Sequence, residues 1–143
     1  MENRHGLVVN PRLTQATGTA EREAALALIR ERPGRQRVTV AGSKNDDTQA
    51  FVHDRRALQV TPHVAQHTTN RASAIAGRTT RPPGSTGSQQ KRKRGEASFG
   101  WLKTVGVLRK VTLRGVQRVG WLFTFAAAVY NLVRMRNLVE AAT

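Results

Sequence analysis

The sequence contains no cysteine, which excludes disulfide bonds and metal sites built on thiolates. Aromatic residues are scarce, at 5% of the chain. The longest apolar run, from Val119 to Val133, is interrupted by Thr124 and Asn131. It is shorter than the roughly 20 residues that a membrane-spanning helix needs. We therefore expect a buried helix there, and no membrane partner.

Motifs for several common kinds of chemistry are also missing. The segment from Met1 to His5 lacks the apolar stretch of a signal peptide, which favours a cytoplasmic location. Gly42-Ser43-Lys44 lacks the earlier glycine of a phosphate-binding loop, and no serine lies in a nucleophile-elbow pattern. The histidines have no metal-ligand spacing; they are His5, His53, His63 and His67. We expect them to be ordinary polar residues.

Positive charge is what the sequence has in excess. It holds 24 Lys and Arg against 9 Asp and Glu, a formal net charge of +15 over 143 residues. Residues 81–118 contain ten of these cations and one acid, Glu96, whereas residues 1–80 contain twelve cations and seven acids. This imbalance predicts a polyanion-binding surface in the C-terminal half, with nucleic acid as the polyanion. The cations in question are Arg81, Lys91, Arg92, Lys93, Arg94, Lys103, Arg109, Lys110, Arg114 and Arg118.

The N-terminal half has the pattern of an α/β protein. Apolar and β-branched runs predict strands at 6–9, 38–42 and 60–65. A helix is expected from residue 20, capped by Thr19, and another is expected through Phe51 to Leu58, capped by Asp46 or Asp47. Short connections between alternating strands and helices favour parallel strand pairing.

The C-terminal half is expected to be helical after a loop. Residues 66–90 are rich in Thr, Ser, Gly, Arg and Pro, which predicts a flexible basic loop. Helices are expected at about 88–110 and 115–139, the second with Trp121, Phe125 and Leu132 as core contacts. The chain is thereby divided into a strand–helix core at 1–65, the loop at 66–90, and C-terminal helices at 91–143.

One helical face in this half concentrates charge. At 100° per residue, four residues fall within about 40° of one another: Arg92, Glu96, Lys103 and Lys110. Trp101, Val105 and Leu108 form an apolar stripe on the other side. This pattern fits a solvated helix with an Arg92–Glu96 ion pair, and it equally fits a functional carboxylate surrounded by cations.

Several stretches resemble the C-terminal half of bacterial insertion-sequence transposases of the DDE type. They are residues 2–9, 14–23, 60–66, 77–80, Phe99-Gly100-Trp101-Leu102-Lys103-Thr104, Leu108-Arg109-Lys110, Val119-Gly120-Trp121 and Tyr130-Asn131-Leu132-Val133. The resemblance implies an RNase H-like catalytic domain that acts on DNA in transposition and recombination. It also implies two divalent cations, usually Mg²⁺, held by two aspartates and a glutamate. The family's Arg-x3-Glu-x6-Lys signature falls on Arg92, Glu96 and Lys103, which makes Glu96 the expected catalytic and metal-binding residue.

The chain departs from this family at the two aspartates. The family pattern Gly-Ala-Asp-Lys-Gly-Tyr-Asp falls on residues 41–47, so that Ser43 stands in place of the second metal-binding aspartate. Asp47 matches the last aspartate of that pattern, which we interpret as a helix cap, and Asp46 lies three residues from the required place. The first aspartate would belong to a strand upstream of Met1. We therefore expect a partial RNase H-like fold lacking the first two strands, in which strand 6–9 is an unpaired edge.

These observations predict a truncated transposase without independent catalysis that still binds DNA. The DNA-binding residues expected are Arg92, Lys93, Arg94, Lys103, Arg109 and Lys110. Expected partners are DNA and either an intact transposase or a second copy of the chain, at the nucleoid. The alternatives are a stand-alone basic nucleic-acid-binding protein that represses an intact transposase, or one half of a frameshifted element.

Overall fold

A computed structural model describes residues 1–34, 36–69, 72–106 and 108–142. The described residues form five α-helices, one short 3-10 helix and two strands. They group into two compact units, Thr17–Arg92 and a second unit made of Met1–Ala16 with Lys93–Thr143. The predicted α/β class is confirmed at the level of mixed helices and a small parallel sheet.

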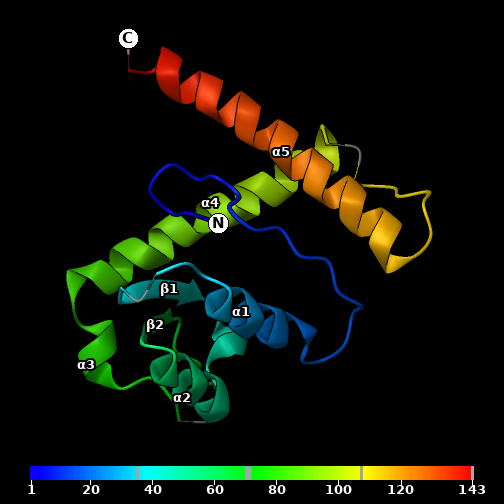
Figure 1. Ribbon diagram of the computed structural model, residues 1–143. Helices are drawn as coiled ribbons and strands as arrows, with labels where there is room; N and C mark the ends of the chain where they lie inside the picture. Colours follow the sequence, from blue (N-terminus) through cyan, green and yellow to red (C-terminus); the bar gives the residue numbers. More distant parts are fainter. Residues whose placement is uncertain (35, 70–71, 107, 143) are drawn as a thin grey trace. The chain divides into compact units, whose positions relative to one another are not determined.

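The unit Thr17–Arg92 is built on two strands, β1 (Val38–Gly42) and β2 (Val60–Val64). They pair in parallel, with Val38 opposite Val60 and Gly42 opposite Val64 (Figure 1). Strands 38–42 and 60–65 were both predicted, because runs rich in β-branched residues favour a pleated backbone. Alternation in β2 buries Val60, Pro62 and Val64 on one face.

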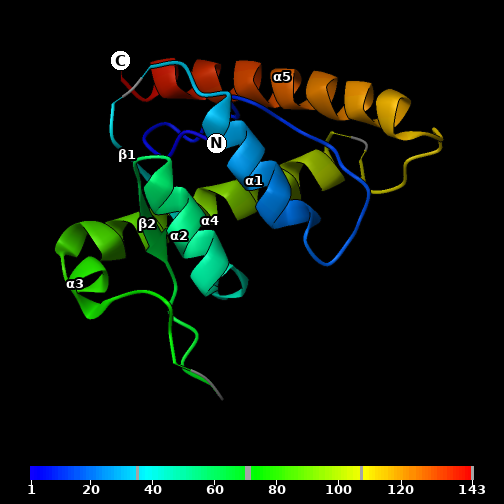
Figure 2. The ribbon, with the colours of Figure 1, turned by 60° about the horizontal axis from the view of Figure 1, so that its bottom comes forward.

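Helix α2 (Gln49–Ala57) connects the two strands and packs against β2 (Figure 2). Val52 of α2, Val64 of β2 and Ile75 form the apolar core of this unit. Helix α1 (Ala20–Arg30) lies against α2, and the short α3 (Gly77–Thr80) lies against β2. The predicted helix from residue 20 is thus confirmed. Thr19 is its N-cap, but Thr17 Oγ1 accepts the hydrogen bond from the N–H of Ala20, at 3.0 Å.

Helix α4 (Pro83–Thr104) begins in this unit and continues into the other. Its first turns are held by the sheet. Ser88 Oγ lies 2.9 Å from Nδ1 of His63, and the amide of Gln89 donates to the carbonyl oxygens of Gly42 (3.2 Å) and His63. Burial lowers the pKa of His63, which favours the neutral ring at this contact.

Helix boundaries in the C-terminal half differ from the prediction of 88–110. The helix begins at Pro83, since proline needs no N–H partner at the first helical position. It ends at Thr104 because the chain turns at Gly106, where a Cβ would lie 2.8 Å from the carbonyl oxygen of Leu102. Lys110 is consequently not on the charged face of this helix. Residue 107 of the predicted helix lies outside the described residues.

The segment 66–90 contains more regular structure than predicted. It holds α3 and the beginning of α4, where we expected a loop. Residues 70–71 lie outside the described residues. The flexibility of the segment and the three-part division of the chain remain predictions.

The second unit combines the N-terminal segment, the end of α4, and α5 (Val116–Glu140), close to the helix predicted at 115–139. Helices α4 and α5 meet through two aromatic pairs, Phe99 with Phe123 and Trp101 with Tyr130, whose ring centroids are 6.1 Å and 5.6 Å apart. Their buried residues are mainly small, and include Ser98, Ala126 and Ala127 beside Leu102.

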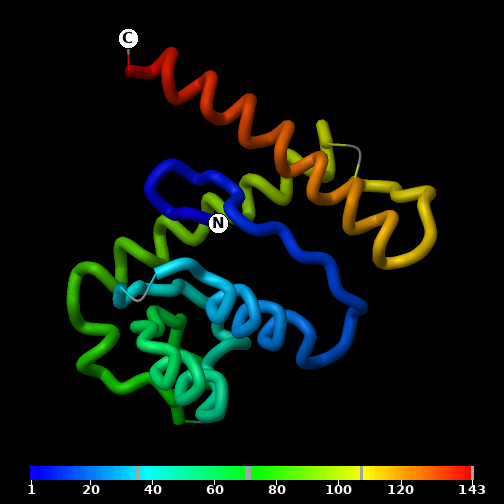
Figure 3. The backbone as a smooth tube through the Cα atoms, in the orientation of Figure 1, coloured from blue at the N-terminus to red at the C-terminus, as the bar shows by residue number. Residues whose placement is uncertain are grey.

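The strand predicted at 6–9 is wrong. Residues 6–9 have no strand conformation; they belong to a loop that passes between α4 and α5 (Figure 3). Gly6 adopts a φ of +76°, which β-branched residues avoid. The backbone of this loop takes its hydrogen-bond partners from side chains of α4 and α5 and from within the loop itself, so it needs no neighbouring strand.

Among the described residues, no helix combines the length and the apolar content needed to cross a membrane.

Candidate functional site

Ser43 lies directly after β1, at the point predicted to replace a metal-binding aspartate. Its backbone N–H and its hydroxyl both donate to Oδ2 of Asp46, at 2.7 Å and 3.2 Å. Residues 44–46 form a single 3-10 turn, which brings the Asp46 carboxylate back over Ser43. Asp46 is therefore a local cap of this turn, and the prediction that it caps α2 is wrong.

The Asp46 carboxylate also lies beside a buried cation. Arg55 is 2% exposed, and its guanidinium stacks over the ring of Phe51 at 4.0 Å. Burial lowers the pKa of Arg55, and the negative charge of Asp46 opposes part of this shift. There is no space for a side chain between them, because a Cβ on Gly42 would lie 2.9 Å from Asp46 Oδ2 and 3.1 Å from Arg55 Nη1. The space beside β1 is filled by these two charged side chains.

The carboxylate of Asp47 accepts hydrogen bonds from a different part of the chain. It is 1% exposed, and its two carboxylate oxygens accept backbone N–H groups of His67 (2.7 Å) and Ala74 (2.8 Å). These bonds tie the segment after β2 to the turn after β1. The helix α2 is capped by Thr48, whose Oγ1 accepts from the N–H of Phe51 at 3.4 Å. The prediction that Asp47 caps α2 is therefore wrong.

Glu96 lies within α4 and is exposed, with Arg92 one turn before it and Lys103 two turns after it. Helical spacing places these three on one face, as predicted. The buried side of the helix differs from the predicted stripe: Ser98 and Leu102 are each 2% exposed, while Val105 is 60% exposed. Val105 is exposed because α4 ends just before it, so the helical period no longer applies there.

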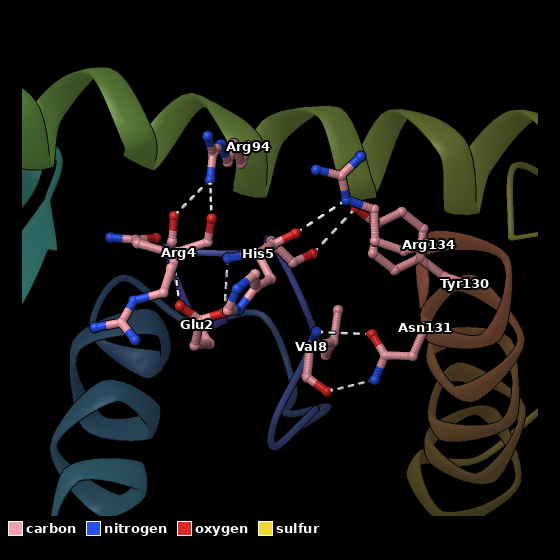
Figure 4. Close-up of polar contacts among 10 residues, drawn as sticks. Glu2, Arg4, His5, Val8, Arg94, Tyr130, Asn131 and Arg134 are labelled. Atoms are coloured by element: carbon pink, nitrogen blue, oxygen red, sulfur yellow. Dashed lines mark hydrogen bonds and ion pairs between the residues drawn. The ribbon is translucent and has the colours of Figure 1, made fainter. Parts of the chain in front are cut away.

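The N-terminal segment is held by a set of polar side chains from α4 and α5 (Figure 4). Asn131 forms a two-way pair with the backbone of Val8, accepting from its N–H and donating to its carbonyl oxygen, both at 2.8 Å. Tyr130 donates to the carbonyl oxygen of Gly6 at 3.2 Å. Such paired amide bonds replace the two bonds that a neighbouring strand would offer.

Two arginines complete this set. Arg134 donates through Nε to the carbonyl oxygen of His5 at 2.9 Å, and Arg94 donates to the carbonyl oxygens of Asn3 (2.8 Å) and Arg4. Arg94 was predicted to bind DNA; in the structure its guanidinium binds the backbone of the N-terminal segment. The sequence signal for this arrangement is the pair Tyr130-Asn131, whose structural role could not be recognised without knowing the partner.

Six exposed cations of this unit lie along α4, in the connection that follows it, and at the start of α5. Lys93 and Lys103 lie on α4, and the others lie between α4 and α5 or at the start of α5; these are Arg109, Lys110, Arg114 and Arg118. Ser43 belongs to the other unit, Thr17–Arg92, as does Arg92.

Comparison with known proteins identifies the family. A family model described as "Transposase DDE domain" matches residues 44–136 of the chain. The chain belongs to this family of DDE-domain transposases. No curated protein and no solved structure matches it. The matched range begins immediately after Ser43 and includes Glu96 and the Tyr130-Asn131 pair.

Transposases of the DDE type are generally metal-dependent, which makes the fit of these residues to Mg²⁺ important. Magnesium needs oxygen ligands with free lone pairs in octahedral geometry. Asp46 is committed to Ser43 and faces Arg55, and both oxygens of Asp47 are committed to backbone N–H groups. Among the described residues, no group of three or more His, Asp or Glu could hold a metal ion together. The residues after β1 do not fit a magnesium site.

Proposed function

We propose that this protein binds DNA as a member of the transposase family and that the 143-residue chain does not cleave DNA by itself. The observation that carries the proposal is the state of the residues after β1: Ser43 supplies no carboxylate, and Asp46 and Asp47 are used by the fold. In the family the catalytic metals need two aspartates beside the glutamate, for which Glu96 is our candidate. With a serine at position 43, this set of metal ligands is incomplete.

The DNA-binding part of the proposal rests on the exposed cations. Lys93, Lys103, Arg109 and Lys110 project from one unit together with Arg114 and Arg118. Contacts of this type bind phosphates without regard to base sequence. Arg92 remains a candidate on the preceding turn of α4. Association with the nucleoid follows if this surface operates in a cell.

The start of α5 supports the same interpretation. Its N-cap is Gly115, with a φ of +92° and no side-chain cap, and Arg114 and Arg118 flank it. Cations beside the positive end of a helix dipole are unfavourable by about a few tenths of a kcal/mol each. A DNA phosphate placed there would reverse the sign of that interaction.

The parallel β1–α2–β2 arrangement supports a partial RNase H-like fold as the origin of this chain. It contains a strand, a crossover helix and a second strand in the order that such a fold uses. The Glu96 helix then follows in sequence, as expected from the insertion-sequence transposases that the chain resembles.

The test of inactivity is a strand-cleavage assay. Duplexes that carry the terminal repeats of the element are incubated with the purified chain and Mg²⁺ or Mn²⁺. We expect no cleavage above a protein-free control, and saturable binding of the same duplex. Cleavage that disappears in Glu96→Gln would overturn the proposal. Cleavage that persists in that variant would indicate a contaminating nuclease.

A second candidate function is repression of an intact transposase by competition for DNA. It is favoured by the exposed cations, which do not depend on the metal ligands. The test is an excision assay with an intact relative, in which increasing amounts of this chain should reduce excision. A variant with Arg109, Lys110 and Arg114 changed to alanine should lose the inhibition.

A further inference from the structure

Helix α5 presents an unusual row of exposed apolar side chains, which we call the α5 stripe. Five of its members are large, with exposed fractions between 42% and 67%. The spacing alternates strictly between four and three residues. The stripe consists of Trp121, Phe125, Ala128, Leu132, Met135 and Val139.

The stripe is separate from the face of α5 that packs within its own unit. Ala126 and Ala127 are buried, and Tyr130, Asn131 and Arg134 bind the N-terminal segment. At 100° per residue, these five centre roughly opposite the stripe. The helix therefore has two faces, one that packs within its own unit and one that is apolar and exposed.

The four–three alternation fits pairing with another helix. A 3.5-residue repeat keeps an apolar seam facing another helix, with side chains packed as knobs into holes. At one end of the seam, the rings of Trp121 and Phe125 stack at 5.6 Å and 4°, so two of its knobs are already ordered.

We propose that the α5 stripe pairs with the α5 stripe of a second copy of this chain, in antiparallel orientation. The sizes of the side chains select this orientation. An antiparallel pair centred on residue 130 sets Trp121 against Val139, Phe125 against Met135, and Ala128 against Leu132. Each layer then combines a larger with a smaller side chain, which fills space evenly.

A parallel pair of the same helices would be poorly packed. It would place Trp121 against Trp121 in one layer and Ala128 against Ala128 two layers later. The first layer is overfilled and the second leaves a void, and both faults destabilise a packed seam.

Charge at the two ends favours the same orientation. Arg114 and Arg118 lie at the beginning of α5, whereas Arg136 and Glu140 at its end form an ion pair at 3.5 Å. Antiparallel pairing brings the cationic beginning of α5 to the end of the other copy's α5, where Glu140 offsets one of the two arginines, and to the negative end of its helix dipole. Parallel pairing would bring the two cationic ends together.

The available area fits a weak dimer. The exposed fractions are 67% for Trp121, 56% for Phe125, 64% for Leu132, 42% for Met135 and 65% for Val139. With aromatic side chains contributing ~150–250 Å² when fully exposed, the stripe offers about 500–600 Å² per copy. The total of about 1,000–1,200 Å² lies at the lower limit of specific interfaces. We therefore expect a dimer that dissociates at micromolar concentration.

The first test is sedimentation equilibrium of the full chain without DNA, from about 1 to 200 µM. Wild-type protein should pass from monomer to dimer across this range. Leu132→Glu, at the middle of the stripe, should weaken association at least tenfold. The matched control Asn137→Glu adds the same charge at an exposed position of α5 outside the stripe and should associate like wild type. Circular dichroism checks that both variants fold.

A wild-type chain that stays monomeric at about 200 µM would overturn the proposal, and so would a dimer that Leu132→Glu leaves intact. The second outcome would mean that another surface carries the association. Loss of association in Asn137→Glu as well would also count against the stripe.

Orientation is tested by a spin label on Val139→Cys, the only cysteine in such a chain because the native sequence has none. In the antiparallel dimer, residue 139 lies opposite residue 121 of the other copy. The two labelled backbones are then about 27 Å apart along the helix axis, at 1.5 Å per residue. A single short distance of about 10–15 Å would show a parallel pair and would overturn the orientation proposed here.

Discussion

The hydroxyl and the N–H of Ser43 share one acceptor, Asp46 Oδ2, at 3.2 Å and 2.7 Å. Placing at this position the carboxylate that the family pattern predicts, by Ser43→Asp, would remove the hydroxyl donor and set two negative charges against each other. We expect the free energy of unfolding to fall by about 2 kcal/mol in the absence of divalent ions. Urea denaturation in EDTA measures this loss.

Ser43→Asn is the matched control, because asparagine has the shape of aspartate without its charge. Its free energy of unfolding should change by less than that of Ser43→Asp. Millimolar Mg²⁺ should restore part of the loss in the aspartate variant alone, since a cation screens the paired carboxylates. Equal losses in the two variants, with no response to Mg²⁺, would contradict the repulsion argument.

The carboxylate of Asp47 is a second position where one side chain supports two segments. In Asp47→Asn, one oxygen becomes an NH₂ group, which cannot accept a hydrogen bond from the N–H of His67 or Ala74. One buried backbone donor loses its charged partner, and we expect a loss of ~1.5–3 kcal/mol in the free energy of unfolding. Urea denaturation of Asp54→Asn provides the control, because Asp54 is partly exposed and lies 3.6 Å from the exposed ring of His53. That change should alter stability by less than ~0.5 kcal/mol.

The roles of these aspartates could not be predicted from local sequence. Asp46, Asp47 and Thr48 are adjacent, and all three residue types are good N-caps. The choice of Thr48 depends on where the chain returns after β2, since Asp47 is needed by residues 67 and 74. The prediction that Ser43 replaces a metal-binding aspartate, by contrast, came from aligning the family pattern to the end of a predicted strand, and it stays a prediction.

At the scale of single elements, one charge change at the beginning of α5 is expected to raise the stability of the fold and to weaken DNA binding. Arg118 lies in the first turn of this helix, next to uncapped N–H groups. Arg118→Glu should raise the free energy of unfolding by about 0.5 kcal/mol, because an anion there suits the helix dipole. The same change should weaken DNA binding several-fold, because it replaces a phosphate contact with a repelling charge. Thermal unfolding and a fluorescence-anisotropy titration measure the two effects.

Arg136→Glu is the comparison for this experiment, since it makes the same charge change at the other end of α5. It removes the ion pair with Glu140 and places an anion near the negative end of the dipole, so stability should fall. If both variants were destabilised to the same degree, the dipole would not be the cause.

Elements whose partners are local were predicted well, and those with distant partners were not. The runs predicted as strands at 38–42 and 60–65 and as a helix at 115–139 each form the expected strand or helix. The run Gly6-Leu7-Val8-Val9 has strand composition too. Gly6 and Val8 of this run bond to Tyr130 and Asn131, at sequence separations of 124 and 123 residues, and no local pattern contains that information.

Over the whole molecule, the surplus of positive charge was evident from composition. Composition did not show which cations the fold uses and which are exposed for binding. Arg94 and Arg134 bind backbone carbonyl groups, and Arg55 is buried against Phe51. A DNA-binding prediction based on counting cations therefore includes side chains that the fold itself uses. Of the six exposed cations proposed to bind DNA, five lie between the last turn of α4 and the first turn of α5, and Lys93 lies further back on α4.

The number of exposed cations gives a quantitative prediction for the salt dependence of DNA binding by the whole chain. If these six cations each neutralise one phosphate, the logarithm of the binding constant should fall with the logarithm of salt concentration at a slope of about −5. Changing Arg109, Lys110 and Arg114 together to alanine should reduce the magnitude of that slope by about 2.7, since each neutralised phosphate contributes about 0.9. Titrations of a short duplex at about 50, 100 and 200 mM salt measure both slopes.

The control for this experiment is Arg30→Ala with Arg56→Ala, two exposed cations of the other unit. These changes alter the net charge of the chain nearly as much as the triple variant does, but they leave the α4–α5 segment intact. Slopes that follow net charge alone would fall by similar amounts in the two variants. Slopes that follow a defined surface fall in the triple variant and hardly change in the control, which is the result we expect.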